Sequence, residues 1–236
     1  MTRTAVWTTI AQTLTAEIAG GQYRPGDRLP TEADLARRFG VNRHTVRRAL
    51  SELQGQGLTH ARRGAGVFVS ARPTEYPLGR RVRFHQTLRA AGQMPDKRIL
   101  RRETRRPNAG EQQLLDLADG DEVHVYEGLS SADGVPIALF RSVFPAGRLP
   151  GLLDRLDATG SVTEALAAEG IADYTRASTR VTAKLATATQ AGLLRISPGD
   201  PVLRTDSVNV DPEGRPIEIG RTWFAADRVS LTVAPD

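Results

Sequence analysis

Side chains that can form forked hydrogen bonds cluster between residues 42 and 48 of this 236-residue chain. Arginine can donate two parallel hydrogen bonds to a phosphate or to the major-groove edge of guanine. Five arginines and no acidic residue lie between positions 35 and 51. Asparagine, histidine and threonine accompany them and can complete a polar contact surface. This stretch therefore predicts binding to a polyanion, with DNA as the best match.

The element that must position these side chains is a helix that begins near Asn42. Val46, Leu50 and Leu53 recur at helical spacing and form one apolar face. With Asn42 as the N-cap, Arg43 and His44 lie in the first turn, the part of a recognition helix that enters the major groove. An amphipathic helix with a solvated basic face would show the same pattern.

The flanking sequence favours the DNA-binding interpretation. Thr31 and Gly40 are the expected cap residues of a short preceding helix, and two such helices joined by a tight turn form a helix-turn-helix. Residues 57–69 then predict two strands around an Arg-Arg-Gly tip, which is typical of a wing. The predicted DNA contacts are Arg28, Thr31, Asn42, Arg43, His44, Thr45, Arg47, Arg48, Arg62, Arg63 and Gly64.

Three motifs in this region resemble one protein family. They are Tyr-Arg-Pro-Gly-Asp-Arg-Leu-Pro-Thr-Glu at residues 23–32, Val-Asn-Arg-His-Thr-Val-Arg-Arg-Ala-Leu at residues 41–50, and the glycine-rich wing. Their order and spacing resemble the winged helix-turn-helix domain of GntR-type bacterial repressors. The resemblance implies a homodimer that binds double-stranded DNA at an inverted-repeat operator.

The charge of the chain is concentrated in its first third. Residues 1–70 hold ten arginines and no lysine against five acids, whereas the last 156 residues carry 20 basic and 21 acidic groups. A basic module joined to a neutral one fits a DNA-binding domain with an attached partner domain. There is no cysteine and no apolar run near the ~20 residues of a membrane span. We expect a cytoplasmic protein with no cofactor, no metal site and no membrane partner.

The chain is predicted to consist of residues 1–70, a linker at residues 71–81 and a second domain at residues 82–236. The linker is suggested by two prolines and a glycine in a polar run. A helix is expected at residues 83–91. Two hairpins are expected, at residues 123–144 around Asp133-Gly134 and at residues 201–225 around residues 211–214. Helices at residues 108–117, 161–169 and 187–194 complete a mixed α+β fold with an antiparallel sheet.

The second domain resembles the UTRA effector domain of the HutC branch of GntR regulators, which is chorismate-lyase-like in fold. The resemblance rests on Leu-Ala-Asp-Gly-Asp-Glu-Val at residues 117–123, Ala-Asp-Gly-Val-Pro-Ile at residues 132–137 and Gly-Arg-Pro-Ile-Glu at residues 214–218. Residues 41–49 and 72–78 most resemble the phosphonate-metabolism regulators. UTRA domains bind small polar or anionic metabolites, so we expect an anionic effector here, such as a phosphonate or a phosphate ester.

By resemblance, Ser161 and Glu218 match effector-binding positions, and Arg141 and Arg221 lie on strands that could reach the same pocket. Ser161 would begin a short helix, and a helix N-terminus favours anions, although a plain capping role explains this serine equally well. Either arginine is also an ordinary strand residue exposed to water. Sugar-phosphate-binding members carry two arginines where this chain has Gly128 and Ser130. This departure argues against a sugar phosphate, and Arg141 or Arg221 would have to supply the charge.

The leading hypothesis is a repressor of phosphonate- or phosphate-related genes that a small anion releases from its operator. One alternative is a lyase-like enzyme, but no Ser/His/Asp set, metal cluster or glycine-rich phosphate loop supports catalysis. The other is a constitutive DNA-binding dimer without an effector. A basic run from Lys97 to Arg106 is best explained as charge on an exposed edge strand, where it prevents edge-to-edge aggregation.

Overall fold

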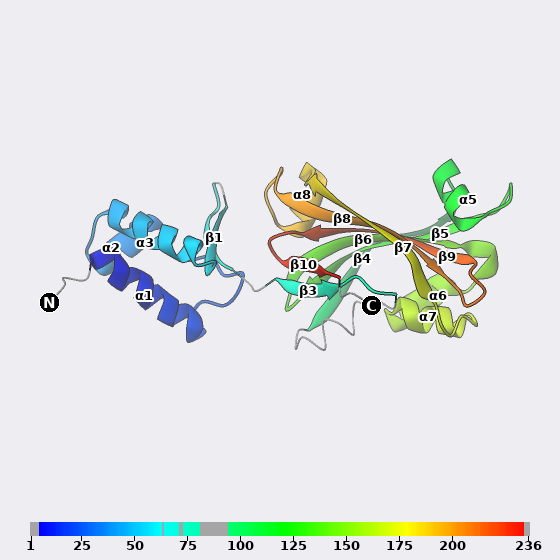
Figure 1. Cartoon of the computed structure of the whole chain (residues 1–236), viewed down its shortest axis with the longest axis horizontal. Coiled ribbons are helices and arrows are strands. Elements are labelled where there is room, and N and C mark those ends of the chain that lie inside the picture. Colours follow the sequence, from blue (N-terminus) through cyan, green and yellow to red (C-terminus); the bar gives the residue numbers. More distant parts are fainter. Residues whose placement is uncertain (1–4, 63, 71–72, 81–93, 234–236) are drawn as a thin grey trace. The chain divides into compact units, whose positions relative to one another are not determined.

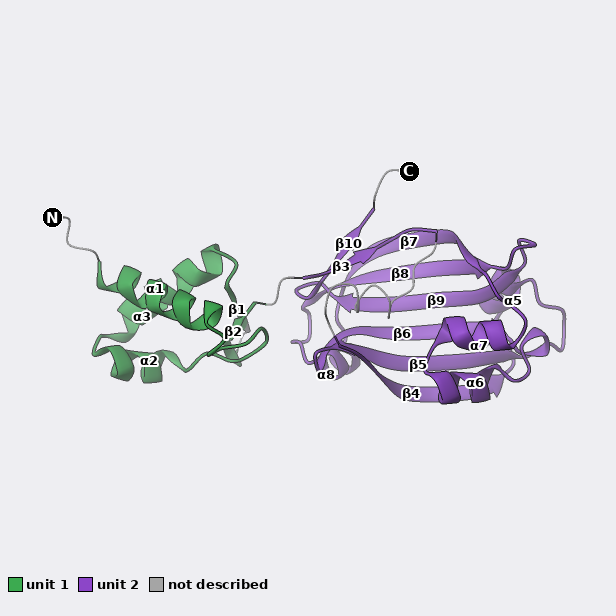
Figure 2. Cartoon of the chain, turned by 90° about the horizontal axis from the view of Figure 1, so that it is seen from below, with its two compact units in different colours: residues 1–72 green, residues 73–236 purple. Residues whose placement is uncertain are grey.

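The computed structural model describes residues 5–62, 64–70, 73–80 and 94–233. The chain divides into two compact units, residues 1–72 and residues 73–236 (Figures 1 and 2). The predicted wing residue Arg63 and the predicted helix at residues 83–91 lie outside the described residues. Residues 73–80, which the sequence suggested as linker, belong to the second unit.

The first unit consists of three helices and a hairpin. Its elements are α1 (Val6–Ala19), α2 (Glu32–Phe39), α3 (Arg43–Gly55), β1 (Thr59–Arg62) and β2 (Gly66–Val69), with β1 and β2 antiparallel. The buried core is made of Ile10, Ala11, Leu14, Leu29, Leu35, Val46, Ala49, Leu50, Leu53 and Val69. The apolar face predicted for α3 is therefore the face that packs inward, and the basic face stays outside.

The turn between α2 and α3 has the predicted chemistry. The Thr31 hydroxyl accepts a hydrogen bond from the Asp34 N–H at 3.2 Å and caps α2, and Gly40 ends that helix with a left-handed φ of 63°. The Asn42 side chain accepts from the Thr45 N–H at 2.9 Å and caps α3. These caps satisfy backbone groups that helix ends leave unpaired. The predicted winged helix-turn-helix is confirmed.

A six-stranded antiparallel sheet forms the centre of the second unit. Its strands are β4 (Pro95–Arg105), β5 (Val123–Ala132), β6 (Val135–Pro145), β7 (Thr175–Leu185), β8 (Pro201–Val210) and β9 (Pro216–Ala225), and their order is β4-β5-β6-β9-β8-β7. Both predicted hairpins are present, as β5–β6 and β8–β9. Strand β4 is an edge, as the basic run suggested. The α+β class is confirmed.

Helices cover both faces of this sheet. Helices α6 (Leu152–Thr159) and α7 (Val162–Ala168) follow the short 3-10 turn η1 (Ala146–Arg148) and lie in front of the sheet in Figure 2. They pack on Tyr126, Phe140 and Phe144. Helices α5 (Ala109–Leu115) and α8 (Ala188–Leu194) pack on the other face. Along β6, even-numbered residues therefore face α6 and α7, and Leu139 and Val143 face α5 and α8.

Two short strands form a separate parallel pair. Strand β3 (Thr74–Pro77) pairs with β10 (Val229–Thr232), with Tyr76 opposite Leu231. Tyr76 packs against Phe224 of the main sheet, with ring centroids 5.0 Å apart. The segment then continues to Arg80, whose carbonyl accepts from the Arg176 N–H at 2.9 Å. The chain that leaves the first unit is thus fixed to the second unit within a few residues.

Candidate functional site

The start of α3 presents two accessible polar side chains. Arg43 and His44 are both exposed, and neither forms a hydrogen bond or ion pair with any residue that the structure describes. They follow the cap residue Asn42, so they stand in the first turn of a thirteen-residue helix. This is the part of a recognition helix that contacts base edges. The structure thus places both side chains where the DNA prediction needs them.

The other two arginines of α3 are engaged within the unit. Arg47 donates two hydrogen bonds to Glu32 of α2, from Nε at 3.0 Å and from a terminal nitrogen at 2.8 Å. This hydrogen bond from Arg47 is the main cause that lowers the pKa of Glu32. The guanidinium of Arg48 lies over the Trp7 ring of α1, 4.6 Å from its centroid. Arg47 must break an ion pair before it can contact a base.

Three more predicted contacts belong to the helix caps, Thr31 and Asn42 as capping residues and Thr45 as a donor to Asn42. Thr31 both accepts from the Asp34 N–H and donates to the Asp34 carboxylate at 2.6 Å. The Asn42 side-chain oxygen accepts from the N–H and the hydroxyl of Thr45, at 2.9 and 3.0 Å. These groups hold α2 and α3 in position, so their contribution to DNA contact is first a positional one.

Arg28 lies against the wing. Its backbone forms an isolated bridge with Phe68, and its side chain reaches the backbone of Gly66. A Cβ atom at Gly66 would lie 2.8 Å from the Arg28 Nε, and Gly66 also has a φ of 111°. Arg62 ends β1, and Gly64 has a φ of 73° at the wing tip. The close approach of the Arg28 side chain, together with the positive φ, explains why glycine is needed at position 66.

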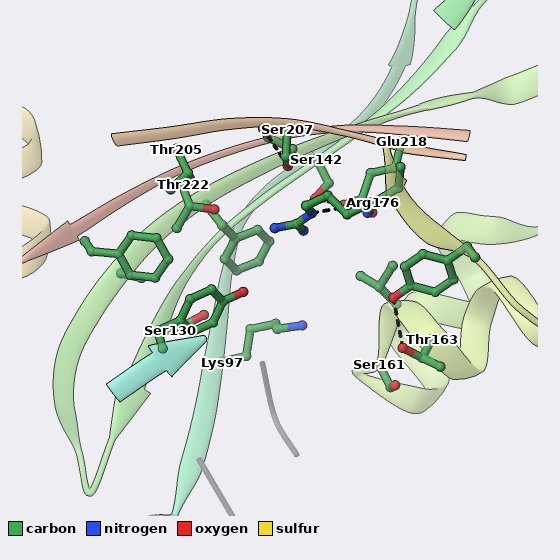
Figure 3. Close-up of a pocket in the computed structure, with 18 of the residues that line it drawn as sticks. Lys97, Ser130, Ser142, Ser161, Thr163, Arg176, Thr205, Ser207, Glu218 and Thr222 are labelled. Carbon is green, nitrogen blue, oxygen red and sulfur yellow. Dashed lines mark hydrogen bonds between the residues drawn. The ribbon is translucent and has the colours of Figure 1, made fainter. Parts of the chain in front are cut away.

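A cavity of about 380 Å³ opens on the face of the sheet that α6 and α7 cover (Figure 3). This volume suits a small metabolite. The lining combines aromatic rings with many polar groups, and it draws on all six strands of the sheet, on β3 and on α7. Its polar and charged members are Tyr76, Lys97, Ser130, Ser142, Thr159, Ser161, Thr163, Glu164, Tyr174, Arg176, Thr205, Ser207, Asn209, Glu218 and Thr222.

Two cations reach this cavity from opposite edges of the sheet. Lys97 is on edge strand β4 and Arg176 is on edge strand β7, and both side chains point into the cavity in Figure 3. The Lys97 ammonium donates to the Gly160 carbonyl at 3.0 Å and lies 5.2 Å from the Phe140 ring centroid. Burial lowers the pKa of Lys97, and the charge of Glu218 opposes that shift.

Glu218 supplies the buried acid of the cavity. Its carboxylate accepts from the Ser142 hydroxyl at 2.6 Å and from the Asn209 amide at 2.7 Å. The Asn209 carbonyl oxygen in turn accepts from Arg176 Nε at 3.2 Å. An Arg176–Asn209–Glu218–Ser142 network therefore runs along one wall. The predicted site residue Glu218 lines the cavity, as does Ser161.

Ser161 begins α7 and caps it. Its hydroxyl accepts from the Glu164 N–H at 3.3 Å. The neighbouring Thr163 hydroxyl forms a hydrogen bond of 3.0 Å with the Tyr174 hydroxyl, so α7 is tied to the start of β7. Both interpretations of Ser161 remain compatible with the structure, because a capping hydroxyl can also line a cavity.

The predicted partners Arg141 and Arg221 do not lie in this cavity. They face each other in register on β6 and β9, where Ser142 and Gly220 point to the opposite side. Side chains alternate along a strand, so a residue next to a cavity residue faces away from the cavity. Both arginines instead line a hollow of about 160 Å³ beside α5, where Arg141 pairs with Glu111. The expectation that either one neutralises an anion beside Ser161 therefore needs correction.

The sequence-based prediction did not include Lys97 or Arg176 among the effector-binding residues, and it interpreted Lys97 as an exposed edge-strand charge. A Cβ atom at Gly128 would lie 2.6 Å from the Phe140 ring, so no longer side chain fits there without moving that ring. Lys97 is opposite Ser130 in the sheet and reaches over the same ring. The cations that line this cavity therefore come from the two edge strands and not from the positions of Gly128 and Ser130.

The described residues contain neither a metal-binding cluster nor a membrane-spanning helix. Within them, no three His, Cys, Asp or Glu side chains form a group that could hold a metal ion. Over the same part of the chain, no helix is long and apolar enough to cross a membrane.

Comparison with known proteins matches both units. Residues 7–69 match "Bacterial regulatory proteins, gntR family" and residues 90–230 match "UTRA domain". An uncharacterised HTH-type transcriptional regulator of Rhizobium meliloti is 40% identical over 97% of this chain and 94% of its own length. The probable transcriptional regulator PhnF of Escherichia coli is 34% identical over 89% of this chain and 88% of its own.

The crystal structure of PhnF from Mycobacterium smegmatis covers 96% of this chain and 99% of its own, with 27% identity and a TM-score of 0.69. These relatives are transcriptional regulators and not enzymes, which excludes the lyase-like alternative. A winged helix-turn-helix with accessible polar side chains at the start of its recognition helix precedes a sheet domain with a polar cavity. The chain belongs to the GntR family of bacterial transcriptional regulators, in the HutC branch that carries a UTRA domain, and it is PhnF-like.

Proposed function

We propose that this chain is a cytoplasmic repressor that binds an inverted-repeat operator as a homodimer and leaves it when a small anion binds the sheet cavity. The observation that carries the effector assignment is the convergence of Lys97 and Arg176 on one cavity. Among the described residues, Lys97 donates to the Gly160 carbonyl and Arg176 to the Asn209 amide oxygen, and neither forms an ion pair. Glu218 acts on Lys97 only at longer range, so both cations are available to an anionic ligand.

The resemblance to phosphonate-metabolism regulators and the similarity to PhnF support a chemical class for this anion. A phosphonate or a phosphate ester offers three oxygens that can accept from Lys97 and Arg176 together. The same similarity supports phosphonate- or phosphate-related genes as the regulated set. Ser161 and Thr163 add hydroxyl donors on the α7 side of the cavity.

Strand β3 provides a physical route from the cavity to the DNA-binding unit. Tyr76 of β3 lines the cavity, and the first unit ends only a few residues before this strand. A ligand can shift the protein between two states only if it binds one of them more tightly. A ligand that contacts Tyr76 would meet this condition if it binds more tightly to one position of β3 than to another.

The test is operator binding by the full chain in the presence of defined anions. Labelled duplexes from the region upstream of its own gene and of neighbouring genes are titrated, and binding is followed by fluorescence anisotropy. We expect tight, sequence-selective binding by a dimer, weakened by a phosphonate or a phosphate ester. Affinity that no anion changes would support the constitutive DNA-binding dimer instead. Sedimentation at micromolar concentration checks the dimer, and a monomer would contradict it.

A further inference from the structure

Two acids line the cavity beside the cations, and the buried one, Glu218, does not fit a simple anion site. The Glu218 carboxylate is only 7% exposed and lines the same cavity as Lys97 and Arg176. Its two hydrogen-bond partners, Ser142 and Asn209, are neutral. In the described part of the chain, Glu218 forms no ion pair, and the Lys97 ammonium acts on it only at longer range. A buried charge is costly unless it is closely paired, so this carboxylate can gain from a nearer positive partner.

The wall keeps the opposite charges apart. Asn209 stands between Arg176 and Glu218, accepting from Arg176 Nε at 3.2 Å and donating to Glu218 at 2.7 Å. Because both ends of this amide are used, its orientation is fixed and Arg176 does not collapse onto Glu218. A carboxylate can accept about four hydrogen bonds, and the wall supplies two. The cavity therefore presents separate positive and negative surfaces before any ligand enters.

The geometry points to a dipolar effector, with an anionic group held by Lys97 and Arg176 and an ammonium group held by Glu218. This inference rests on the proposed function, since it names the ligand class of the proposed effector site. An ammonium group supplies a positive charge next to Glu218. It also supplies hydrogen-bond donors for the acceptor positions of the carboxylate that the wall leaves unused. A hydroxyl would supply a donor and no charge.

Matched probes separate the two ends of such a ligand. The first set is 2-aminoethylphosphonate, 2-hydroxyethylphosphonate and propylphosphonate, which share the anion and differ at the far end. The second set is β-alanine, 3-hydroxypropionate and butyrate, with a carboxylate as the anion. Calorimetry on the full chain measures each dissociation constant. We expect the ammonium member of at least one set to bind roughly tenfold tighter, or more, than its hydroxyl and alkyl counterparts, as a charge-assisted contact provides.

The variant Glu218→Gln removes the charge and keeps the shape. We expect it to reduce the preference for the ammonium member to less than about threefold, whereas the alkyl member should bind at least as tightly as before, because a negative charge near the anion end has been removed. The control Glu213→Gln makes the same charge change on the exposed β8–β9 turn, where Glu213 pairs only with Arg215. It should keep the full preference. Thermal unfolding confirms that both variants are folded.

Three results would count against the inference. Equal binding of all three members of each set by the parent protein would overturn it and leave the anion site intact, and this result does not depend on any variant. A hydroxyl member that binds as well as the ammonium member would show that Glu218 selects a donor without charge. Binding of no member at millimolar concentration would remove the anion assignment of the proposed function together with the inference.

Discussion

The arginines of α3 look alike in the sequence but differ in what they contact. Arg43 is exposed at the start of the helix, Arg47 forms a forked pair with Glu32, and the Arg48 guanidinium lies over Trp7. An arginine already paired must exchange its partner for DNA, and the gain is then smaller. Base recognition is therefore expected to depend mainly on Arg43, supported by His44.

Arg43→Ala should cost about 1–3 kcal/mol of operator affinity and relax base preference at one position of each half-site. The reason is the loss of a bidentate contact to a base edge. Anisotropy titrations with operator variants measure both effects. Arg106→Ala removes the same charge from an exposed position in the second unit and serves as the control. Unchanged discrimination in the Arg43→Ala protein would exclude Arg43 as a base contact.

Lys97→Met should abolish effector response without loss of stability. Burial lowers the pKa of Lys97, so the folded protein binds the Lys97 proton less tightly than the unfolded chain does. This penalty is present at neutral pH and disappears above the ordinary lysine pKa of 10.5, where both states are neutral. The variant should unfold at an equal or higher temperature at pH 7, and this difference should shrink above pH 10.5.

The control for this change is Lys184→Met, which alters an exposed lysine at the end of β7. It should keep both the effector response and the parent's unfolding temperature. A Lys97→Met protein that still releases operator at the parent's effector concentration would show that the ammonium is not part of the site.

At the scale of elements, local chemistry explains what the sequence could predict. Caps at Thr31 and Asn42, and turns at Asp133-Gly134 and residues 211–214, are decided by side chains close in the chain. Strands β3 and β10 were not predicted, because two four-residue strands far apart in the chain pair only in the folded state. The side of the sheet that Arg141 faces depends on register, which the pattern alone did not provide.

The β8–β9 turn contains a buried carboxylate that should give it a pH-dependent stability. Asp211 accepts from the Arg215 N–H at 2.8 Å and from the Arg148 guanidinium, which comes from η1. Burial alone would raise the pKa of Asp211, but these hydrogen bonds lower it below 3.8. A lowered carboxyl pKa contributes stability that is present above pH 3.8 and lost as the pH falls through the folded-state value.

Asp211→Asn should therefore lower the free energy of unfolding by about 1.5–3 kcal/mol at pH 7, the range for hydrogen bonds to charged groups. The difference in the free energy of unfolding between the variant and the parent protein should become smaller as the pH falls below 3.8. Denaturant titrations at several pH values measure this. Glu213→Gln, at an exposed position of the same turn, should leave the stability unchanged. A gap that does not depend on pH would show that shape, not charge, is what Asp211 provides.

At the scale of the whole molecule, regulation requires that cavity and DNA-binding unit influence each other. Coupling of about 1–3 kcal/mol between effector and operator would be typical, and it must act equally in both directions. Tyr76 belongs to the cavity wall and to the strand that follows the first unit. It is the described residue best placed to carry this coupling.

Tyr76→Ala should separate the two activities. Operator affinity without effector is expected to stay within about twofold of the parent, whereas the effector-induced loss of affinity should fall below about threefold, less than the roughly fivefold lower limit of typical coupling. Anisotropy titrations with and without effector give both values. Tyr76→Phe keeps the ring against Phe224 and should keep most of the coupling. Full effector response in the alanine variant would place the route elsewhere.

The parallel pairing of β3 with β10 also matters during protein synthesis. Strand β3 follows directly on the DNA-binding unit, but its partner, residues 229–232, leaves the ribosome only after all the strands of the main sheet. The winged helix-turn-helix has its own core and can fold first, as N-terminal domains do. A chain that stops or is cleaved before Val229 would thus keep its DNA-binding unit and lose β10, the strand that pairs with β3. If the proposed function holds, such a fragment would compete for operators without answering to the effector, so effector control would require complete translation.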